Sequence, residues 1–131
     1  DGGNHTINLN LTGERLVGLF GEGGENSNLC NIRTTGSVSM TGYYAGGIVA
    51  NMYGNVVNCH NEASVTGYYH VGGIVGISDN SKYIINCSNS GAIVGNMNVG
   101  GIVGNISTLK VINCLNTGTV QGGSCGIFRL I

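Results

Sequence analysis

Apolar and polar residues alternate along short segments of the chain. Apolar side chains fall at every second position around Val57 and Cys59 and again near Val65, and the same alternation returns over residues 85–93. No stripe of apolar residues at helical spacing is sustained. Because side chains on a strand point alternately to opposite faces, this pattern predicts short β-strands throughout the chain.

These segments belong to an internal repeat with a period near 27 residues. A block of the form Asn-Cys-x-Asn begins at Asn31, Asn58, Asn86 and Asn113. The first copy is degenerate, with Ile in place of the Cys and Thr in place of the second Asn. A second block, Gly-Gly-Ile-Val, begins at Gly46, Gly72 and Gly100. The two blocks keep the same order in every copy, which indicates one structural unit per period.

A repeat of this length contains about three short strands, near I-x-N-C, G-x-V and G-G-I-V. One such unit cannot bury its apolar side, but stacked units place each inward side chain about 4.8 Å from its equivalent in the next unit. The sequence therefore predicts an all-β fold, a parallel β-solenoid (β-helix) of three short strands per coil. The rule for parallel crossovers favours a right-handed coil.

The length of 131 residues predicts a single domain. We expect a lead-in or capping coil at residues 1–16, repeats over 17–128 and a truncated end at 129–131. The tail over 126–131 has the pattern of a further coil that stops short. Open ends of a solenoid expose backbone edges, so edge-mediated self-association is a predicted interaction.

Charge and hydropathy exclude two classes of partner. Only 8% of residues are charged and the formal net charge is -1, with the five Lys and Arg scattered along the chain. This composition gives no basic stripe for nucleic acid. The apolar runs are far shorter than the ~20 residues that a spanning helix needs, so membrane insertion is not expected.

The repeat blocks resemble a known family. The Gly18–Gly21 segment (GLFG), the Gly-Gly-Ile-Val-Gly copies and the Asn-Cys-x-Asn-x-Gly-x-Val copies look like GLUG-motif repeats of bacterial surface and secreted proteins. The opening Asp1–Ile7 (DGGNHTI) is similar to a D-G-x-G-H-T-I lead-in, with Asn4 where Gly is usual. The resemblance implies an extracellular or bacterial cell-surface location, in adhesin-like or IgA1-protease-associated proteins, and no settled activity for the repeats themselves.

The cysteines align with apolar residues. Cys59, Cys87 and Cys114 share one repeat position, which Ile32 occupies in the degenerate copy, and Cys30 also aligns with apolar residues. Cβ atoms stacked about 4.8 Å apart lie beyond the ~3.5–4.5 Å that disulfides prefer. No C-x-x-C or Cys/His pair has the spacing of a metal site. Free buried thiols are favoured, with a disulfide between coils or a metal site as alternatives, and no cofactor is expected.

Two columns of polar residues follow from the same alignment. One contains Asn31, Asn58, Asn86 and Asn113, and the other contains Thr34, Asn61, Asn89 and Asn116. Stacked amides can hydrogen-bond to one another along a ladder. We therefore expect both columns to be structural ladders at a corner where a strand ends, rather than ligand sites.

Acidic residues recur at no common repeat position, so no pair of carboxylates is placed for acid–base catalysis. No H-E-x-x-H motif surrounds His5, His60 or His70. The sequence predicts no catalytic residue and no enzymatic activity in this chain. Any peptidase activity would belong to another part of a parent protein.

Paired tyrosines are the remaining candidate for ligand binding. The repeat alignment stacks Tyr43 on Tyr68 and Tyr44 on Tyr69, with His70 beside them. Exposed aromatic rings can stack on a sugar or anchor a protein partner. The alternative is that these rings pack between coils. Candidate binding residues are Tyr43, Tyr44, Tyr68, Tyr69 and His70, and the partner would be a host glycan or a host or matrix protein.

The sequence thus predicts a non-catalytic repeat module of a bacterial extracellular protein, either an adhesion surface or a stalk. The alternative is an accessory spacer or targeting domain of a secreted IgA1-protease-like or glycan-active enzyme.

Overall fold

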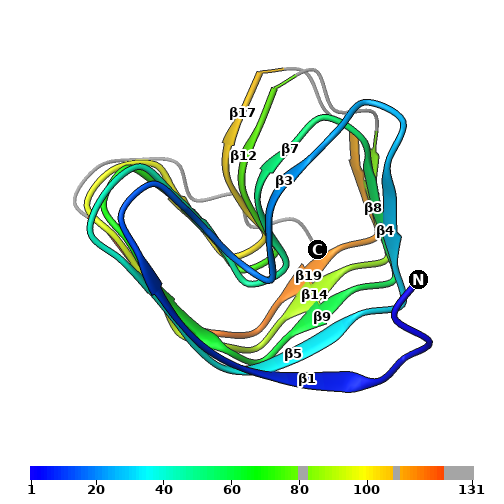
Figure 1. Ribbon diagram of the computed structural model, residues 1–131, viewed down its shortest axis with the longest axis horizontal. Helices are drawn as coiled ribbons and strands as arrows, with labels where there is room; N and C mark the ends of the chain where they lie inside the picture. The colour runs from blue at the N-terminus through cyan, green and yellow to red at the C-terminus, as the bar shows by residue number, and fades with distance from the viewer. Residues whose placement is uncertain (80–82, 108–109, 123–131) are drawn as a thin grey trace.

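The computed structural model describes residues 1–79, 83–107 and 110–122, and every regular element in these ranges is a β-strand. The strands stack coil upon coil in four parallel sheets, as Figure 1 shows in a view down the stack. The predicted fold, a parallel β-solenoid with a repeat near 27 residues, is confirmed. Residues 126–131, for which a further coil is predicted, and the end at 129–131 lie outside the described residues.

The longest sheet, which we call the base sheet, runs along the bottom of Figure 1. Its strands are β1 (Thr6–Gly13), β5 (Arg33–Met40), β9 (His60–Asn61), β10 (Ser64–Thr66), β14 (Ser88–Asn89), β15 (Ile93–Val94), β19 (Leu115–Asn116) and β20 (Val120–Gln121). The lead-in contributes β1, which pairs with β5 over its whole length. The lead-in therefore contains the base strand of the first coil.

Each of the other three sheets has four strands. The corner sheet consists of β2 (Leu16–Val17), β6 (Tyr44–Gly46), β11 (His70–Gly72) and β16 (Val99–Gly100). The central sheet consists of β3 (Phe20–Gly23), β7 (Val49–Met52), β12 (Val75–Ser78) and β17 (Val103–Ile106). The side sheet consists of β4 (Asn28–Cys30), β8 (Asn55–Val57), β13 (Tyr83–Ile85) and β18 (Lys110–Ile112).

A coil thus contains five short strands in four sheets, for example β6 to β10, whereas the sequence predicted three strands per coil. The difference arises because the Gly-Gly-Ile-Val block and the I-x-N-C segment each contain a turn between two strands. In the second coil β6 ends at Gly46 and β7 begins at Val49, so the chain reverses direction between them. The block is a tight turn between two sheets, and its strands lie side by side in the middle of Figure 1.

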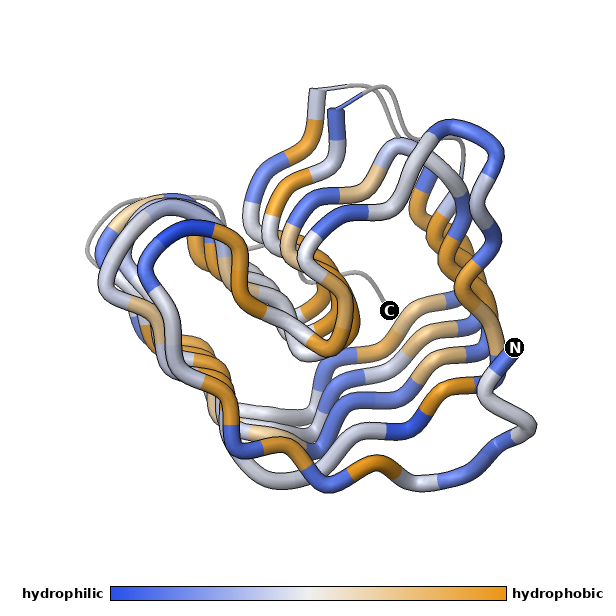
Figure 2. Tube along the Cα trace, in the orientation of Figure 1, coloured by the Kyte–Doolittle hydropathy of each residue, from blue (hydrophilic) through white to orange (hydrophobic). Residues whose placement is uncertain are grey.

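This reversal divides the cross-section into two lobes, each with its own apolar core (Figure 2). One lobe lies between the central, side and base sheets and is filled by stacked residues such as Ile48, Ile74 and Ile102. The corner lobe lies between the corner and base sheets and is filled by residues such as Val65 and Val71. Like side chains recur at the same place in successive coils, which is how the repeat buries its apolar face.

The Gly pair is required because the turn touches the base sheet. A methyl group on Gly73 would lie 2.2 Å from the Gly101 carbonyl oxygen and 2.5 Å from Cγ of Asn89. A methyl group on Gly47 would lie 2.3 Å from Oδ1 of Asn61. No side chain fits in this space, so the Gly pair lets the turn press against the base sheet and separate the two cores.

The corner between the side sheet and the base sheet has a different requirement. Its residues have left-handed backbone angles, with φ of 56°, 53°, 54° and 51° at Asn31, Asn58, Asn86 and Asn113. Asn tolerates this conformation better than other residues with a side chain. The first Asn column of the sequence therefore marks a backbone turn repeated in every coil.

Candidate binding site

Exposed aromatic residues gather at the turn that leads into the corner sheet. We call Tyr43, Tyr44, Tyr68, Tyr69 and His70 the tyrosine corner. Tyr43 stacks on Tyr69 with ring centroids 5.6 Å apart and planes at 14°, and Tyr44 lies 5.1 Å from His70. The predicted pairs, Tyr43 with Tyr68 and Tyr44 with Tyr69, are therefore wrong by one residue.

The shift has a simple cause in the strand pairing. Gly46 of β6 pairs with Gly72 of β11, and Tyr44 consequently pairs with His70. The second corner has one residue more than the first between its leading Gly and this strand. Counting forward from the leading Gly gives the wrong partner, because the strand, not the loop, sets the register.

The extra residue, Tyr68, turns its ring to the solvent. Tyr68 contacts Tyr69 edge-on, with centroids 4.9 Å apart, and its carbonyl oxygen accepts hydrogen bonds from the amides of Asn96 and Met97. Tyr43, Tyr68 and Tyr69 are 53%, 45% and 37% exposed, whereas Tyr44 is half-buried. The corner therefore offers three accessible rings that contact one another.

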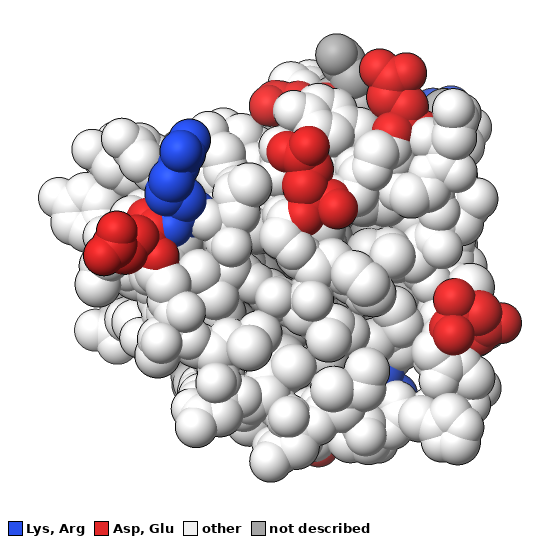
Figure 3. Space-filling view, viewed as in Figure 1, with Lys and Arg blue, Asp and Glu red and all other residues white. Residues whose placement is uncertain are grey.

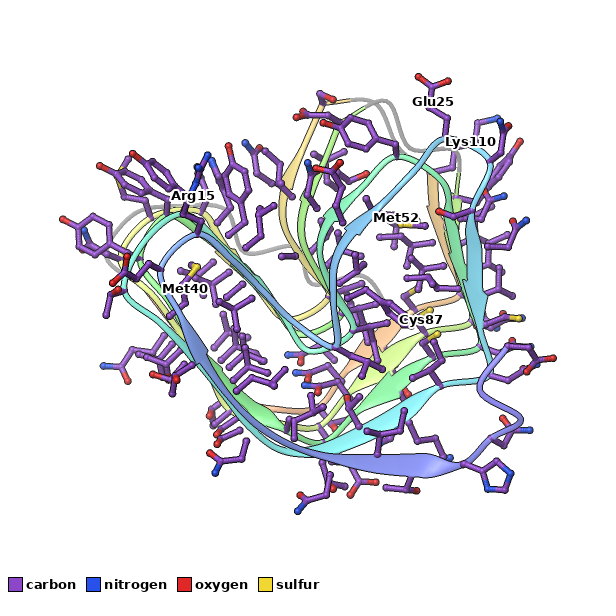
Figure 4. The ribbon with its side chains drawn as sticks, viewed as in Figure 1. Arg15, Glu25, Met40, Met52, Cys87 and Lys110 are labelled. Carbon is purple, nitrogen blue, oxygen red and sulfur yellow. The ribbon has the colours of Figure 1, made fainter. Side chains whose placement is uncertain are left out.

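A cavity of about 280 Å³ opens beside Tyr43 and Tyr44, between the corner sheet and the central sheet. Its lining residues are Arg15, Leu16, Glu22, Tyr43, Tyr44 and Asn51. Figure 4 shows Arg15 at the tip of the corner lobe. Sequence reasoning missed Arg15, Leu16, Glu22 and Asn51. The available signal was Asn51, a polar residue in the otherwise apolar run Val49–Met52.

Asn51 is the most buried polar group of the cavity, at 5% exposure. Its Nδ2 donates to Oε2 of Glu22 and to the hydroxyl oxygen of Tyr53, both at 3.2 Å. Its Oδ1 is buried and has no hydrogen-bond partner among the described residues. Oδ1 of Asn55, which does not line the cavity, is buried without a partner in the same way.

His70 links the tyrosine corner to the next coil. Nδ2 of Asn98 donates to Nδ1 of His70 at 3.0 Å, which requires that this ring nitrogen carry no proton. Burial lowers the pKa of His70, and the charge of Asp79 opposes this effect. The folded corner therefore favours the neutral imidazole.

The cysteine column lies in the lobe between the central and side sheets, where Figure 4 shows Cys87 pointing inward. Cys59, Cys87 and Cys114 are at most 2% exposed, and these three and Cys30 are free thiols. The pKa of Cys87 is raised, chiefly by its hydrogen bond with Cys114 and to a smaller extent by that with Cys59. The same interaction with Cys87 lowers the pKa of Cys114 to about 7. No group of three or more metal-ligating side chains occurs in the described part of the chain.

The inner Asn column forms the predicted ladder, and Asn61, Asn89 and Asn116 are the last residues of β9, β14 and β19. Each side chain donates a hydrogen bond of 2.7 Å to the amide oxygen Oδ1 of the equivalent Asn in the next coil. The donors are Oγ1 of Thr34, Nδ2 of Asn61 and Nδ2 of Asn89, and the last acceptor is Asn116. The column lies beneath the Gly pairs, in the middle of the base sheet. In the outer column, which begins at Asn31, Nδ2 of Asn113 donates a hydrogen bond of 2.6 Å to Oδ1 of Asn86.

One further polar cluster lies on the base sheet. Nδ1 of His60 is 2.5 Å from Oγ of Ser88, and Nε2 of His60 is 3.3 Å from Oε1 of Glu62. Arg33 contacts the same carboxylate at 3.6 Å. Hydroxyl, imidazole and carboxylate in series are the groups of a hydrolase triad, but the cavity described above does not adjoin them. We assign them the role of joining neighbouring coils.

Charged side chains are sparse and of mixed sign on the face shown in Figure 3. No helix in the described ranges is long and apolar enough to span a bilayer. Comparison with protein families, characterised proteins and solved structures found no match. The resemblance to GLUG-motif repeats therefore stays a prediction.

Proposed function

We propose that this chain is a non-catalytic repeat module of a bacterial extracellular or cell-surface protein, and that its tyrosine corner is a binding surface for a host glycan or a host or matrix protein. The observation that carries the proposal is the concentration of exposed rings beside a cavity. Tyr43 and Tyr69 form a stacked pair with Tyr68 against its edge. The location rests on the resemblance to GLUG-motif repeats.

The geometry suits recognition because the rings are already ordered. Tyr offers a large contact area with few rotatable bonds, so binding loses little conformational entropy. Stacking of Tyr43 on Tyr69 across two coils restricts both side chains before a ligand arrives. The strands that follow the rings pair in register, with Tyr44 opposite His70.

The same surface would serve a spacer or targeting domain of a secreted IgA1-protease-like or glycan-active enzyme. In that case the chain would carry the enzyme to its substrate, and the catalytic residues would lie in another part of the protein. The adhesion surface and the targeting domain both need a competent tyrosine corner, whereas a spacer does not.

The test is retention of the purified chain on arrays of glycans and of extracellular-matrix proteins. The variant Tyr43→Ala/Tyr44→Ala/Tyr68→Ala/Tyr69→Ala is compared with Tyr83→Ala, a control that removes a tyrosine of similar exposure from the side sheet. We expect the control to bind as the unchanged chain does and the quadruple variant to lose binding at least tenfold. Equal retention of all three proteins, or no retention of the unchanged chain, would contradict the proposal.

A further inference from the structure

The exposed side chains of the tyrosine corner continue into the coils on either side. Strand pairing places Leu16 of the first coil opposite Tyr44, and it places Met97 of the fourth coil at the position of Tyr69. The amide of Met97 donates a hydrogen bond of 2.9 Å to the carbonyl oxygen of Tyr68. One line of side chains therefore crosses all four coils of the corner sheet.

This line is exposed and apolar over its whole length. Leu16 and Met97 are 39% and 40% exposed, close to the 37% of Tyr69. Five of the eleven large apolar side chains that are exposed in the described part of the chain lie here. We call these five, Leu16, Tyr43, Tyr68, Tyr69 and Met97, the corner ridge. Coils about 4.8 Å apart give it a length of about 14 Å, and a continuous exposed apolar surface marks an interaction site.

The shape of the corner ridge favours a large partner. The ridge lies on the turns at the tip of the corner lobe, which Arg15 marks in Figure 4. The cavity of about 280 Å³ includes only Leu16 and Tyr43 of the ridge in its lining. Small ligands bind mainly in concave sites. Most of the ridge lies outside this cavity, so a partner with a concave surface of its own fits it better.

The chemistry of the corner ridge points to a protein. A sugar needs hydrogen-bonding groups beside the rings that it stacks on, but Leu16 has none and the thioether of Met97 is only a weak acceptor. Tyr, Met and Arg are enriched in protein interfaces, and Lys, Glu and Asp are depleted there. The later coils follow this rule, because residues 41–44, 67–70 and 95–98 contain no Lys, Arg, Asp or Glu.

Arg15 supplies a charge at one end of the ridge. Its carbonyl oxygen accepts a hydrogen bond of 2.8 Å from the amide of Tyr44, which fixes the backbone of Arg15 beside the rings. The side chain is exposed and forms no ion pair with another residue in the described ranges. A guanidinium binds a carboxylate through two parallel hydrogen bonds, and such a pair fixes the orientation of two partners.

We infer that the corner ridge binds a protein, whose surface offers an apolar groove with a carboxylate opposite Arg15. This inference rests on the proposed function, which it narrows from glycan or protein to protein. The tyrosines anchor the partner, and Leu16 and Met97 extend the contact to the outer coils.

The experiment measures binding of the purified chain to the extracellular-matrix proteins of the array, before and after enzymatic removal of their glycans. We expect the affinity to survive this treatment. Leu16→Asn/Met97→Gln should weaken binding at least tenfold. The control Leu115→Asn/Ile112→Gln removes apolar side chains that are 47% and 45% exposed on the base and side sheets, and it should bind as the unchanged chain does.

The charge is tested by reversal. Arg15→Glu should weaken binding at least tenfold, whereas Lys110→Glu, which reverses an exposed charge on the side sheet, should not. Thermal unfolding shows that the variants are folded. Asn98 already occupies the position of Leu16 in the fourth coil, so Leu16→Asn should leave the midpoint close to that of the unchanged chain. Unchanged affinity in Arg15→Glu would overturn the placement of the carboxylate.

Three results would overturn the inference as a whole. These are retention by glycans alone, loss of binding when the matrix proteins are deglycosylated, and full affinity in Leu16→Asn/Met97→Gln. In each case binding that still depended on the tyrosines would leave the proposed function standing. Sedimentation equilibrium covers the remaining occupant, because a dimer that Leu16→Asn/Met97→Gln abolishes would assign the ridge to a second copy of this chain and would also overturn the inference.

Discussion

Nδ2 of Asn61 donates a hydrogen bond to Oδ1 of Asn89 in the next coil, at 2.7 Å and out of contact with solvent. Each amide also donates to a backbone carbonyl of its own coil, Asn61 to Ala63 and Asn89 to Gly91. The ladder thus holds the coils in register along the line where the two cores meet. It is a polar seam in an apolar interior, and it is stable because most of its donors and acceptors are paired.

Removing one step of this ladder should lower stability. The substitution Asn89→Ala removes one of the two acceptors of Nδ2 of Asn61 and the amide that donates to Oδ1 of Asn116, and a buried unpaired group costs about 1–3 kcal/mol. We expect a loss of about 2 kcal/mol or more in the free energy of unfolding by urea. Ser90→Ala, at the exposed neighbouring position, should change it by less than about 0.5 kcal/mol. Equal effects of the two substitutions would show that the ladder contributes nothing to stability.

The Gly pair offers a second comparison within the chain. A methyl group on Gly73 would meet the backbone of Gly101 and the amide of Asn89, whereas nothing lies within 4 Å of a methyl group on Gly24. Gly73→Ala should therefore lower the free energy of unfolding by about 1–3 kcal/mol or more, which is the cost of overpacking in other protein interiors. Gly24→Ala should be close to neutral. Thermal unfolding of both variants checks this, and a small effect at Gly73 would contradict the close approach of the turn to the base sheet.

The repeat period and the fold class could be predicted from the sequence because in-register stacking repeats each residue's environment. The division into two lobes could not, since it depends on how closely Gly73 approaches Asn89 across the interior. The tyrosine register was missed because an extra residue, Tyr68, is absorbed in a loop. The cavity was missed because the repeat column of Asn51, which contains Glu22, Asn51, Ile77 and Asn105, mixes acidic, amide and aliphatic side chains and so forms no motif.

Acid should destabilise the protein through His70. Its pKa is lowered by burial in the folded state, so the unfolded chain binds more protons once the pH falls below about 6.5. Above about pH 6.5, His70 therefore has no effect on the free energy of unfolding. That free energy falls as the pH drops from about 6.5 to the lower pKa that His70 has in the folded state. The next coil has Asn98 at the position of His70. The variant His70→Asn therefore introduces a residue that this position already accepts, and it should reduce the dependence of stability on pH. Thermal unfolding midpoints at pH 7.5 and pH 5 for both proteins measure it; an identical drop in the two proteins would rule His70 out as a cause.

Access should decide the order of thiol modification. Cys30 is partly exposed, whereas Cys59, Cys87 and Cys114 are buried, although the hydrogen bond with Cys87 lowers the pKa of Cys114 to about 7. We expect iodoacetamide at pH 7.5 to label Cys30 before the three buried thiols, and all four to react at similar rates in urea. Peptide mass spectrometry over time gives the order. Labelling of Cys114 ahead of Cys30 in the folded protein would contradict this packing.

The account as a whole depends on the tyrosine corner being a binding surface, and one affinity comparison tests this most directly. The dissociation constant for a ligand retained on the arrays is measured with Tyr69→Ala and with Tyr83→Ala, which remove tyrosines 37% and 38% exposed at different places. We predict at least tenfold weaker binding for Tyr69→Ala and unchanged binding for Tyr83→Ala, with both variants folded. Unchanged affinity in Tyr69→Ala, or an equal loss in both variants, would contradict the account.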